Sequence, residues 1–302
     1  MQTPVSCKNK EANQQQKPLS SPSPSPSPLR QWRPAAQKNL RNQWSKLSSS
    51  NNSWFSAASQ ARSHATSLVN VYLSQRYLRD MDLGALMDMP SIRQHTEEKL
   101  AKRQVIYHSK LLSSYRDMAS SVAHMVQSSS SLRCFFKASS VSSFVQFCNH
   151  PEDASDPGDG GGVPVFSFLS ISNFENLAQE LIEMFLLELN LKRLLVVELL
   201  SSIYKEGDEG ANLLGWCYEL YPGEFDDLRM INMFSSENNE PLPPRIKDWQ
   251  SGDPSTHQSK CPRNHDVLQV YLTAWLADVN IDMNRMREIF SIVEDEIQVK
   301  LS

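Results

Sequence analysis

The chain has 302 residues, a formal net charge of −4 and a hydrophobic content of 40%, which is a little below the globular average. Glycine is scarce, and most apolar residues fall in a few long segments, so the composition disfavours a compact α/β enzyme and favours extended helices. The first fifty residues carry eight Lys or Arg and one acid, which leaves a net charge of −11 on the remainder.

The N-terminal residues 1–36 are expected to form a disordered tail, because a Gln run and four Ser-Pro dipeptides bring almost nothing apolar that could offset the entropy of ordering. The dipeptides offer proline-directed phosphorylation candidates at Ser21, Ser23, Ser25 and Ser27. The sequence Ser-Pro-Leu-Arg at 27–30 has the form preferred by cyclin-dependent kinases. The alternative is a plain disordered spacer. Direct nucleic-acid binding is not expected, since the density of basic residues is low.

Residues 37–129 are predicted to form two long amphipathic helices in an antiparallel, coiled-coil-like hairpin. A break at 80–90 separates the helices, and Ser91 with Gln94 has the pattern of a capping box. The predicted seam of the first helix is Trp44, Leu47, Asn51, Trp54, Ala58, Ala61, Ala65, Leu68 and Tyr72. That of the second is Ala101, Val105, His108, Leu112, Tyr115, Ala119, Val122 and Val126.

A linker is expected at 130–171, with a weak helix at 132–148, and it precedes a long buried helix at 172–204. Ser172 followed by Glu175 supplies a helix start, and apolar residues lie nearly all round the helix. Residues 205–263 lack a sustained period and are predicted to be an irregular insertion. Two short helices then occupy 264–302. The fold class is therefore all-α: an elongated helical hairpin or bundle with a disordered tail.

The cysteines and the apolar segments indicate the compartment. The five cysteines have no C-x-x-C spacing and no signal sequence begins the chain, so free thiols in a reducing compartment are expected. The most apolar stretch, 181–203, contains five charged residues, which are too costly for a bilayer-spanning helix. No membrane association is expected.

No pattern in the sequence points to catalysis, a cofactor or a metal. The glycines at 158–162 lie beside aspartates and lack the Lys-Ser/Thr ending of a phosphate-binding loop. His257, Cys261 and His265 have a spacing that could ligate zinc on a helix, but Pro262 interrupts the segment, and accidental spacing in a loop is the favoured interpretation. We therefore predict a non-enzyme without cofactors.

The predicted long helix and one of the C-terminal helices resemble a known family. The residues that carry the resemblance are Phe174, Leu181, Glu183-Met184, Glu188-Leu189, Leu191-Lys192-Arg193, Glu198-Leu199 and the run Tyr271-Leu272-Thr273-Ala274-Trp275-Leu276. They are similar to the signature helix and the Y-L-x-x-W-L element of the cyclin-dependent kinase 2-interacting protein family. The first helix, with Trp44, is similar to the family's opening helix. The insertion at 207–262 and the Ser-Pro tail depart from the family pattern.

The resemblance implies a non-enzymatic nuclear adaptor, with the cytoplasm as a second compartment. Such an adaptor would bind cyclin-dependent and checkpoint kinases and replication origin factors, and would link DNA replication to DNA-damage signalling. Family members are also associated with a AAA ATPase assembly that acts in replisome proteostasis and ribosome maturation. The alternative is a structural coiled-coil subunit of a cytoskeletal or tethering complex. Homo-oligomerisation is left open by the sequence.

The predicted partner contacts lie in the long helix and the first C-terminal helix, where apolar seams exceed what one hairpin can bury. The candidates are Phe174, Leu181, Met184, Lys192, Arg193, Tyr271 and Trp275. Lys192 and Arg193 are expected to make a polar contact across an interface, and the alternative for both is a solvated stripe on the helix.

Overall fold

The computed structural model shows an all-α protein, as predicted. It describes residues 28–89, 91–137, 146–151, 156–203, 215–247 and 265–301, so the four Ser-Pro phosphorylation candidates lie outside the described residues. The helices are α1 (Pro28–Leu78), a short 3-10 helix (Gly84–Leu86), α2 (Ile92–Ser130), α3 (Ile171–Ile203), α4 (Glu224–Met230), α5 (His265–Ala277) and α6 (Met283–Ile297). None of the described helices has the length and apolar character needed to cross a membrane.

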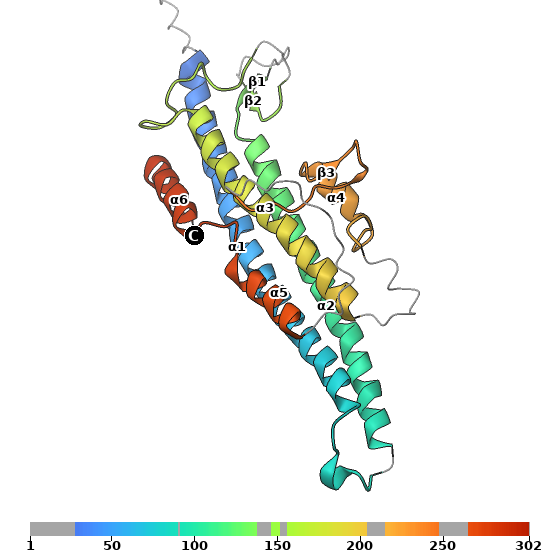
Figure 1. Ribbon diagram of the computed structural model, residues 1–302. Helices are drawn as coiled ribbons and strands as arrows, with labels where there is room; N and C mark the ends of the chain where they lie inside the picture. The colour runs from blue at the N-terminus through green and yellow to red at the C-terminus, as the bar shows by residue number, and fades with distance from the viewer. Residues whose placement is uncertain are drawn as a thin grey trace, which may run out of the picture.

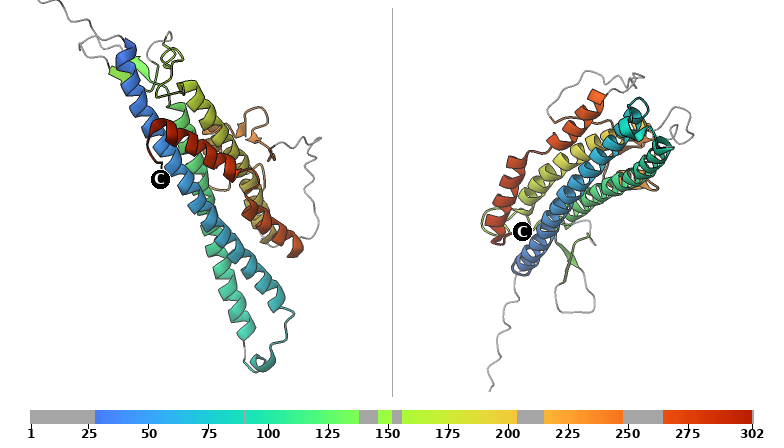
Figure 2. Two further views of the ribbon diagram at one scale, coloured as in Figure 1. Left: turned by 90° about the vertical axis from the view of Figure 1, so that its left-hand side faces the viewer. Right: turned by 90° about the horizontal axis from the view of Figure 1, so that it is seen from below.

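The core lies where α3 packs along the hairpin of α1 and α2 (Figure 1). The predicted seam of α1 is confirmed, because every member is buried except the half-buried Tyr72. Aromatic contacts join α1 to α3: the ring centroids of Trp44 and Phe174 are 6.3 Å apart, and those of Trp54 and Phe185 are 5.3 Å apart. Helices α5 and α6 lie on one side of α3 and the unit containing α4 lies on the other (Figures 1 and 2).

Helix α1 begins at Pro28, whereas the sequence placed the tail's boundary at residue 36. Proline is tolerated in the first turn of a helix, where its missing N–H has no intrahelical partner. The indole of Trp32 is buried and donates a 2.9 Å hydrogen bond to the carbonyl of Cys134. Ala36 is also fully buried. These tertiary contacts stabilise the helix on the N-terminal side of Pro34. Local composition could not reveal them.

The N-terminal half of the predicted α2 seam is wrong. Ala101 and Val105 are exposed, and the buried stripe is Leu111, Tyr115, Met118, Val122 and Met125. No described side chain from Tyr72 to Lys110 is buried. We call this part of the hairpin, residues 72–110, the distal arm and the rest of the protein the body. The arm projects beyond the end of α3 (Figures 1 and 2), so no third helix covers its seam.

Both predicted capping boxes are also wrong. Ser91 has a left-handed backbone, with φ of 67°, and its side chain makes no capping hydrogen bond. At the start of α3 the reciprocal contacts join Ser170 and Asn173. Glu175 instead forms an ion pair with Arg133, with Nε 2.6 Å from Oε1. The side chain that the local sequence pattern predicted to cap the helix therefore contacts a residue far away in the sequence.

Two segments predicted to be irregular contain ordered elements. Where a weak helix was expected, at 132–148, the described residues instead contain β1 (Phe135–Lys137), which pairs antiparallel with β2 (Gln146–Cys148). The insertion contains α4 and a second hairpin, β3 (Phe234–Ser235) with β4 (Glu240–Pro241), and we call its described residues 215–247 the insertion unit. The two predicted C-terminal helices are confirmed as α5 and α6.

Candidate functional site

The predicted partner-contact residues of α3 lie inside the protein. Phe174, Leu181 and Met184 are at most 1% exposed and belong to the core shared with α1 and α6. On α5, Trp275 is buried and its indole donates to the carbonyl of Ala58. Tyr271 is half-buried. The apolar seams that we expected partners to cover are therefore largely covered by α5 and α6 of the same chain.

Lys192 is fully buried and connects α3 to the C-terminal end of α5. Its Nζ lies 2.7 Å from a carboxylate oxygen of Glu188 and 3.0 Å from one of Asp278. The same ammonium donates to the carbonyl of Trp275, at the last turn of α5, where the helix dipole favours a cation. The other oxygen of Glu188 accepts from the backbone N–H of Asn280. Lys192 thus fixes α5 and the turn that follows it.

Arg193 is also fully buried and connects α3 to the insertion unit. Its guanidinium makes a two-point contact with the carboxylate of Glu224, at 2.9 and 3.2 Å. It also donates to the carbonyls of Trp216 and Tyr218, both at 2.9 Å. A guanidinium is suited to this arrangement because its planar donors match carboxylate geometry. Arg193 therefore anchors the insertion unit to the core.

Glu224 has a full set of partners in this buried site. Besides Arg193, it accepts a 2.8 Å hydrogen bond from the hydroxyl of Tyr115 on α2 and a 2.7 Å bond from the N–H of Leu220. Burial raises the pKa of Tyr115 well above its ordinary value, and the negative charge of Glu224 adds to the rise. The hydroxyl therefore stays protonated and serves as a donor, which makes the cluster a structural tie among α2, α3 and α4.

The polar contacts that we expected Lys192 and Arg193 to make with a partner are made within the chain instead. The alternative of a solvated stripe is wrong, because both side chains are fully buried. Sequence reasoning missed Glu224 and Tyr115 as partners. The available signal was two adjacent cations in a helix that is apolar on nearly every side, since consecutive helical residues point about 100° apart and must find separate partners. Nothing local identified Glu224 as the acid, because it lies 31 residues further along the chain.

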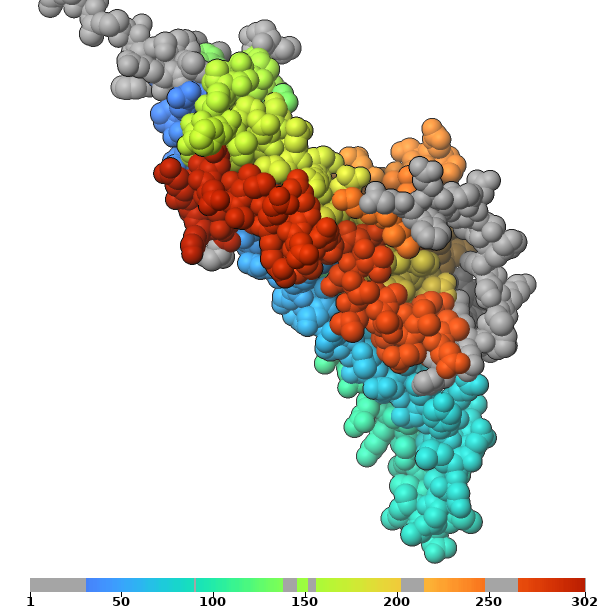
Figure 3. Space-filling view, turned by 60° about the vertical axis from the view of Figure 1, so that its left-hand side comes forward, coloured from blue at the N-terminus to red at the C-terminus, as the bar shows by residue number. Residues whose placement is uncertain are grey.

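The distal arm combines exposed apolar side chains with the absence of any buried side chain among its described residues. Seven large side chains there are about half or more exposed: Tyr77, Met81, Leu86, Met87, Met89, Val105 and Ile106. Met87 and Val105 are 72% and 69% exposed. Figure 3 shows the arm, in cyan, extending past α5. Exposed apolar surface gathered on one projecting element is typical of protein interaction sites.

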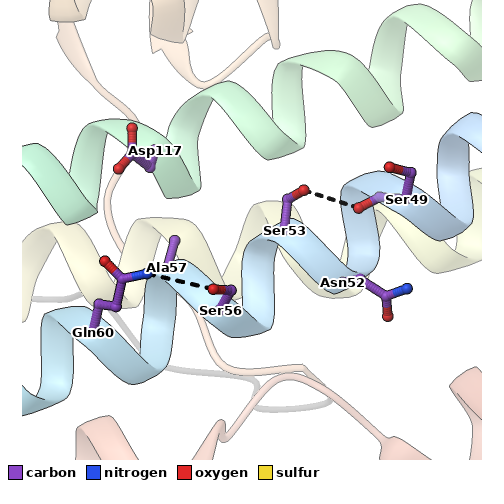
Figure 4. Close-up of a pocket in the computed structure, with 7 residues that line it drawn as sticks. All are labelled: Ser49, Asn52, Ser53, Ser56, Ala57, Gln60 and Asp117. Atoms are coloured by element: carbon purple, nitrogen blue, oxygen red, sulfur yellow. Dashed lines mark hydrogen bonds between the residues drawn. The ribbon is translucent and has the colours of Figure 1, made fainter.

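A shallow depression lies between α1 and α2 in the body (Figure 4). Its lining residues are Ser49, Asn52, Ser53, Ser56, Ala57, Gln60 and Asp117. The hydroxyl of Ser53 donates to the carbonyl of Ser49, and the amide of Gln60 donates to the hydroxyl of Ser56. Asp117 is the single ionisable group in the lining, and the hydrogen bonds given above do not join it to a serine hydroxyl.

The glycines at 158–162 have a packing role. Gly158 and Gly160 have positive φ values of 69° and 66°, and each lies against an aromatic ring, Phe135 and Trp32 respectively. No group of three or more His, Cys, Asp or Glu that could hold a metal ion occurs among the described residues. His257 and Cys261 lie outside the part of the chain that the structure describes.

The described cysteines, Cys134, Cys148 and Cys217, are free thiols, as expected. Burial raises the pKa of Cys134 to about 11.

Comparisons of the chain with protein-family models, with curated proteins and with solved structures found no match.

Proposed function

We propose that this protein is a non-enzymatic helical adaptor, whose body is closed on itself and whose distal arm is an assembly surface. The single observation that carries the proposal is the arm: from Tyr72 to Lys110 no described side chain is buried. A two-helix element without a core of its own gains little from folding alone, because most helical stability comes from burying an apolar face. A partner that covers the arm would supply that burial.

The body is suited to hold the arm in a fixed orientation. Lys192 and Arg193 each join α3 to a different segment through buried contacts, and α1 runs without a break from the body into the arm. A rigid support reduces the conformational entropy that binding would otherwise cost. The chemistry of the described residues also favours binding over catalysis, since the buried charged groups of these clusters are engaged in structural contacts.

The classes of partner follow from the family resemblance. We propose cyclin-dependent and checkpoint kinases, replication origin factors and a AAA ATPase assembly in the nucleus, with Ser21, Ser23, Ser25 and Ser27 as substrate sites for the kinases. The adaptor would then link DNA replication to DNA-damage signalling. The competing function is a structural subunit of a cytoskeletal or tethering complex, which needs the same helices and different partners.

The test is tagged purification of the full chain from nuclear extract, followed by mass spectrometry. A variant with Met87→Lys and Val105→Lys alters the arm, and a variant with Val270→Lys and Leu276→Lys places the same changes at exposed positions of α5. We expect kinases, origin factors or a AAA ATPase with the wild type and the α5 variant, and loss of them with the arm variant. Recovery of cytoskeletal or tethering proteins alone would favour the competing function.

A further inference from the structure

Charge is divided along the distal arm. The acidic tip, residues 80–89, contains Asp80, Asp82 and Asp88 and no basic residue. The basic shaft, residues 99–110 of α2, contains Lys99, Lys102, Arg103 and Lys110 and no acid. All seven side chains belong to exposed residues, and none of them forms an ion pair within the described part of the chain. The tip and the shaft thus present three negative and four positive charges without ion-pair partners among the described residues. The arm also carries Arg76, Arg93 and Glu98, and Arg79 pairs with Glu97.

The spacing of these charges fits a second copy of the same arm. At about 1.5 Å per residue, the basic shaft lies about 10 to 27 Å from the start of α2, next to the tip. Two arms that lie antiparallel, related by a two-fold axis about six residues into α2, would place each tip against the other shaft. A parallel arrangement would bring tip against tip and shaft against shaft, where like charges repel.

We infer that two copies of this chain dimerise through their distal arms in this antiparallel, two-fold arrangement. The contact is isologous, so that the same surface serves on both copies, as in most homodimers. An acidic partner of another kind would neutralise the shaft and leave the tip carboxylates unmatched, whereas a second copy satisfies both. The exposed Met87, Met89, Val105 and Ile106 supply apolar area within the overlap, and four helices replace two.

The inference rests on the proposed assembly role of the arm and names a second copy as one of its occupants. The dimer would hold two bodies at opposite ends of a four-helix connection and would leave the face of each arm outside the overlap for the proposed partners. The overlap is about 20 Å long, which places the contact at the small end of specific interfaces, near 1,200 Å² in total. Its affinity should therefore be modest and should fall as salt screens the tip–shaft attraction.

The experiment measures the mass of the purified full chain by sedimentation equilibrium up to about 100 μM, at low and at high salt. The wild type should approach twice the chain mass of 34.3 kDa at low salt and dissociate as salt is added. The tip variant Asp80→Lys with Asp88→Lys, and the shaft variant Lys99→Glu with Lys102→Glu and Arg103→Glu, should each weaken the dimer at least about tenfold, since each now opposes like charges.

Mixing the two variants is the decisive measurement. The tip variant then presents positive tips and shafts, and the shaft variant presents negative ones, so a mixed dimer is attractive at both contacts and should form. A folding defect in either variant could not produce this rescue. The control Lys38→Glu with Lys46→Glu and Arg62→Glu makes the same charge change as the shaft variant at exposed positions of α1 in the body and should leave the dimer unaltered.

A wild type that remains monomeric at the highest concentration, or a mixture that stays monomeric, would overturn the inference. Neither outcome touches the proposed adaptor function, which is decided by the partners recovered from nuclear extract. Conversely, a dimer that recovers none of the proposed partners would leave the self-association intact and remove the adaptor role.

Discussion

Arg193 and Glu224 form an ion pair in the interior of the protein, with Nε 2.9 Å from Oε1 and both side chains fully buried. Breaking a buried pair leaves an uncompensated charge, which costs about 3–5 kcal/mol. We expect Arg193→Met to lower the free energy of unfolding by about that amount and to release the insertion unit. Urea denaturation measures the first effect, and limited proteolysis within residues 215–247 reports the second.

The matched control lies on the same helix as Glu224. Asp226 and Arg229 form an exposed pair on α4, with side chains 82% and 47% exposed, and such pairs contribute about 0–1 kcal/mol. Asp226→Asn should therefore leave both measurements almost unchanged. Equal losses in the two variants would contradict the assignment of Arg193 as the anchor of the insertion unit.

Lys192→Met should loosen the C-terminal helices in preference to the hairpin. The substitution leaves Glu188 and Asp278 without their shared cation and the carbonyl of Trp275 without a donor. We expect amide hydrogen exchange in residues 265–281 to accelerate well before exchange in the buried half of α2. Lys102→Met, at an exposed position without an ion pair among the described residues, serves as the comparison. Uniform acceleration in all helices would show that Lys192 supports the whole core instead.

Gly160→Ala tests the packing of the N-terminal end of α1. Gly160 has a φ of 66° and lies against the ring of Trp32, so a methyl group adds a steric clash to backbone strain. Gly161 has a comparable φ of 76° with open space around the position of a Cβ, so Gly161→Ala isolates the strain alone. Thermal unfolding should show a loss of more than about 1 kcal/mol for Gly160→Ala and a smaller loss for the control. Similar losses would mean that Trp32 moves aside freely.

The helical part of the fold could be predicted because its signal is local and repeated. The alternation of three and four residues from Trp44 to Tyr72 placed the α1 seam correctly, and the continuous apolar character of residues 181–203 identified α3 as buried. The same periodicity misled in the distal arm. Ala101 and Val105 have suitable spacing, but burial there requires a third helix, and the sequence does not state where α3 ends relative to α2.

The rest of the fold depends on contacts between distant residues. The insertion unit is held by Arg193 through Glu224 and two backbone carbonyls, none of which forms a periodic pattern. The helix start at Pro28 depends on the hydrogen bond from Trp32 to Cys134, more than a hundred residues away. For the candidate site, the sequence pointed to seven residues of α3 and α5 as contacts for partners, whereas six of these side chains are buried in contacts within the body and Tyr271 is half-buried.

Acidification should weaken the docking of α6. Arg285 donates to both carboxylate oxygens of Glu180, at 2.7 and 2.8 Å, and this contact lowers the pKa of Glu180 below its ordinary value of 4.5. Because the folded-state pKa is the lower one, the unfolded chain binds more protons as the pH falls. The contribution of the pair is therefore fully present above about pH 4.5 and is lost as the pH falls through the folded-state value. Both side chains are 33% exposed, so the effect is small, about 0.2–1 kcal/mol.

The measurement is the unfolding free energy from pH 7 to pH 3 for the wild type and for Glu180→Gln. The glutamine variant lacks the titrating group, so the difference between the two proteins should be constant near neutral pH and should shrink toward zero below pH 4.5. Glu183→Gln, at an exposed position one residue before Met184 on the same helix, controls for the loss of a negative charge. A difference that grows on acidification would reverse the sign and show that the carboxylate is destabilised in the folded protein.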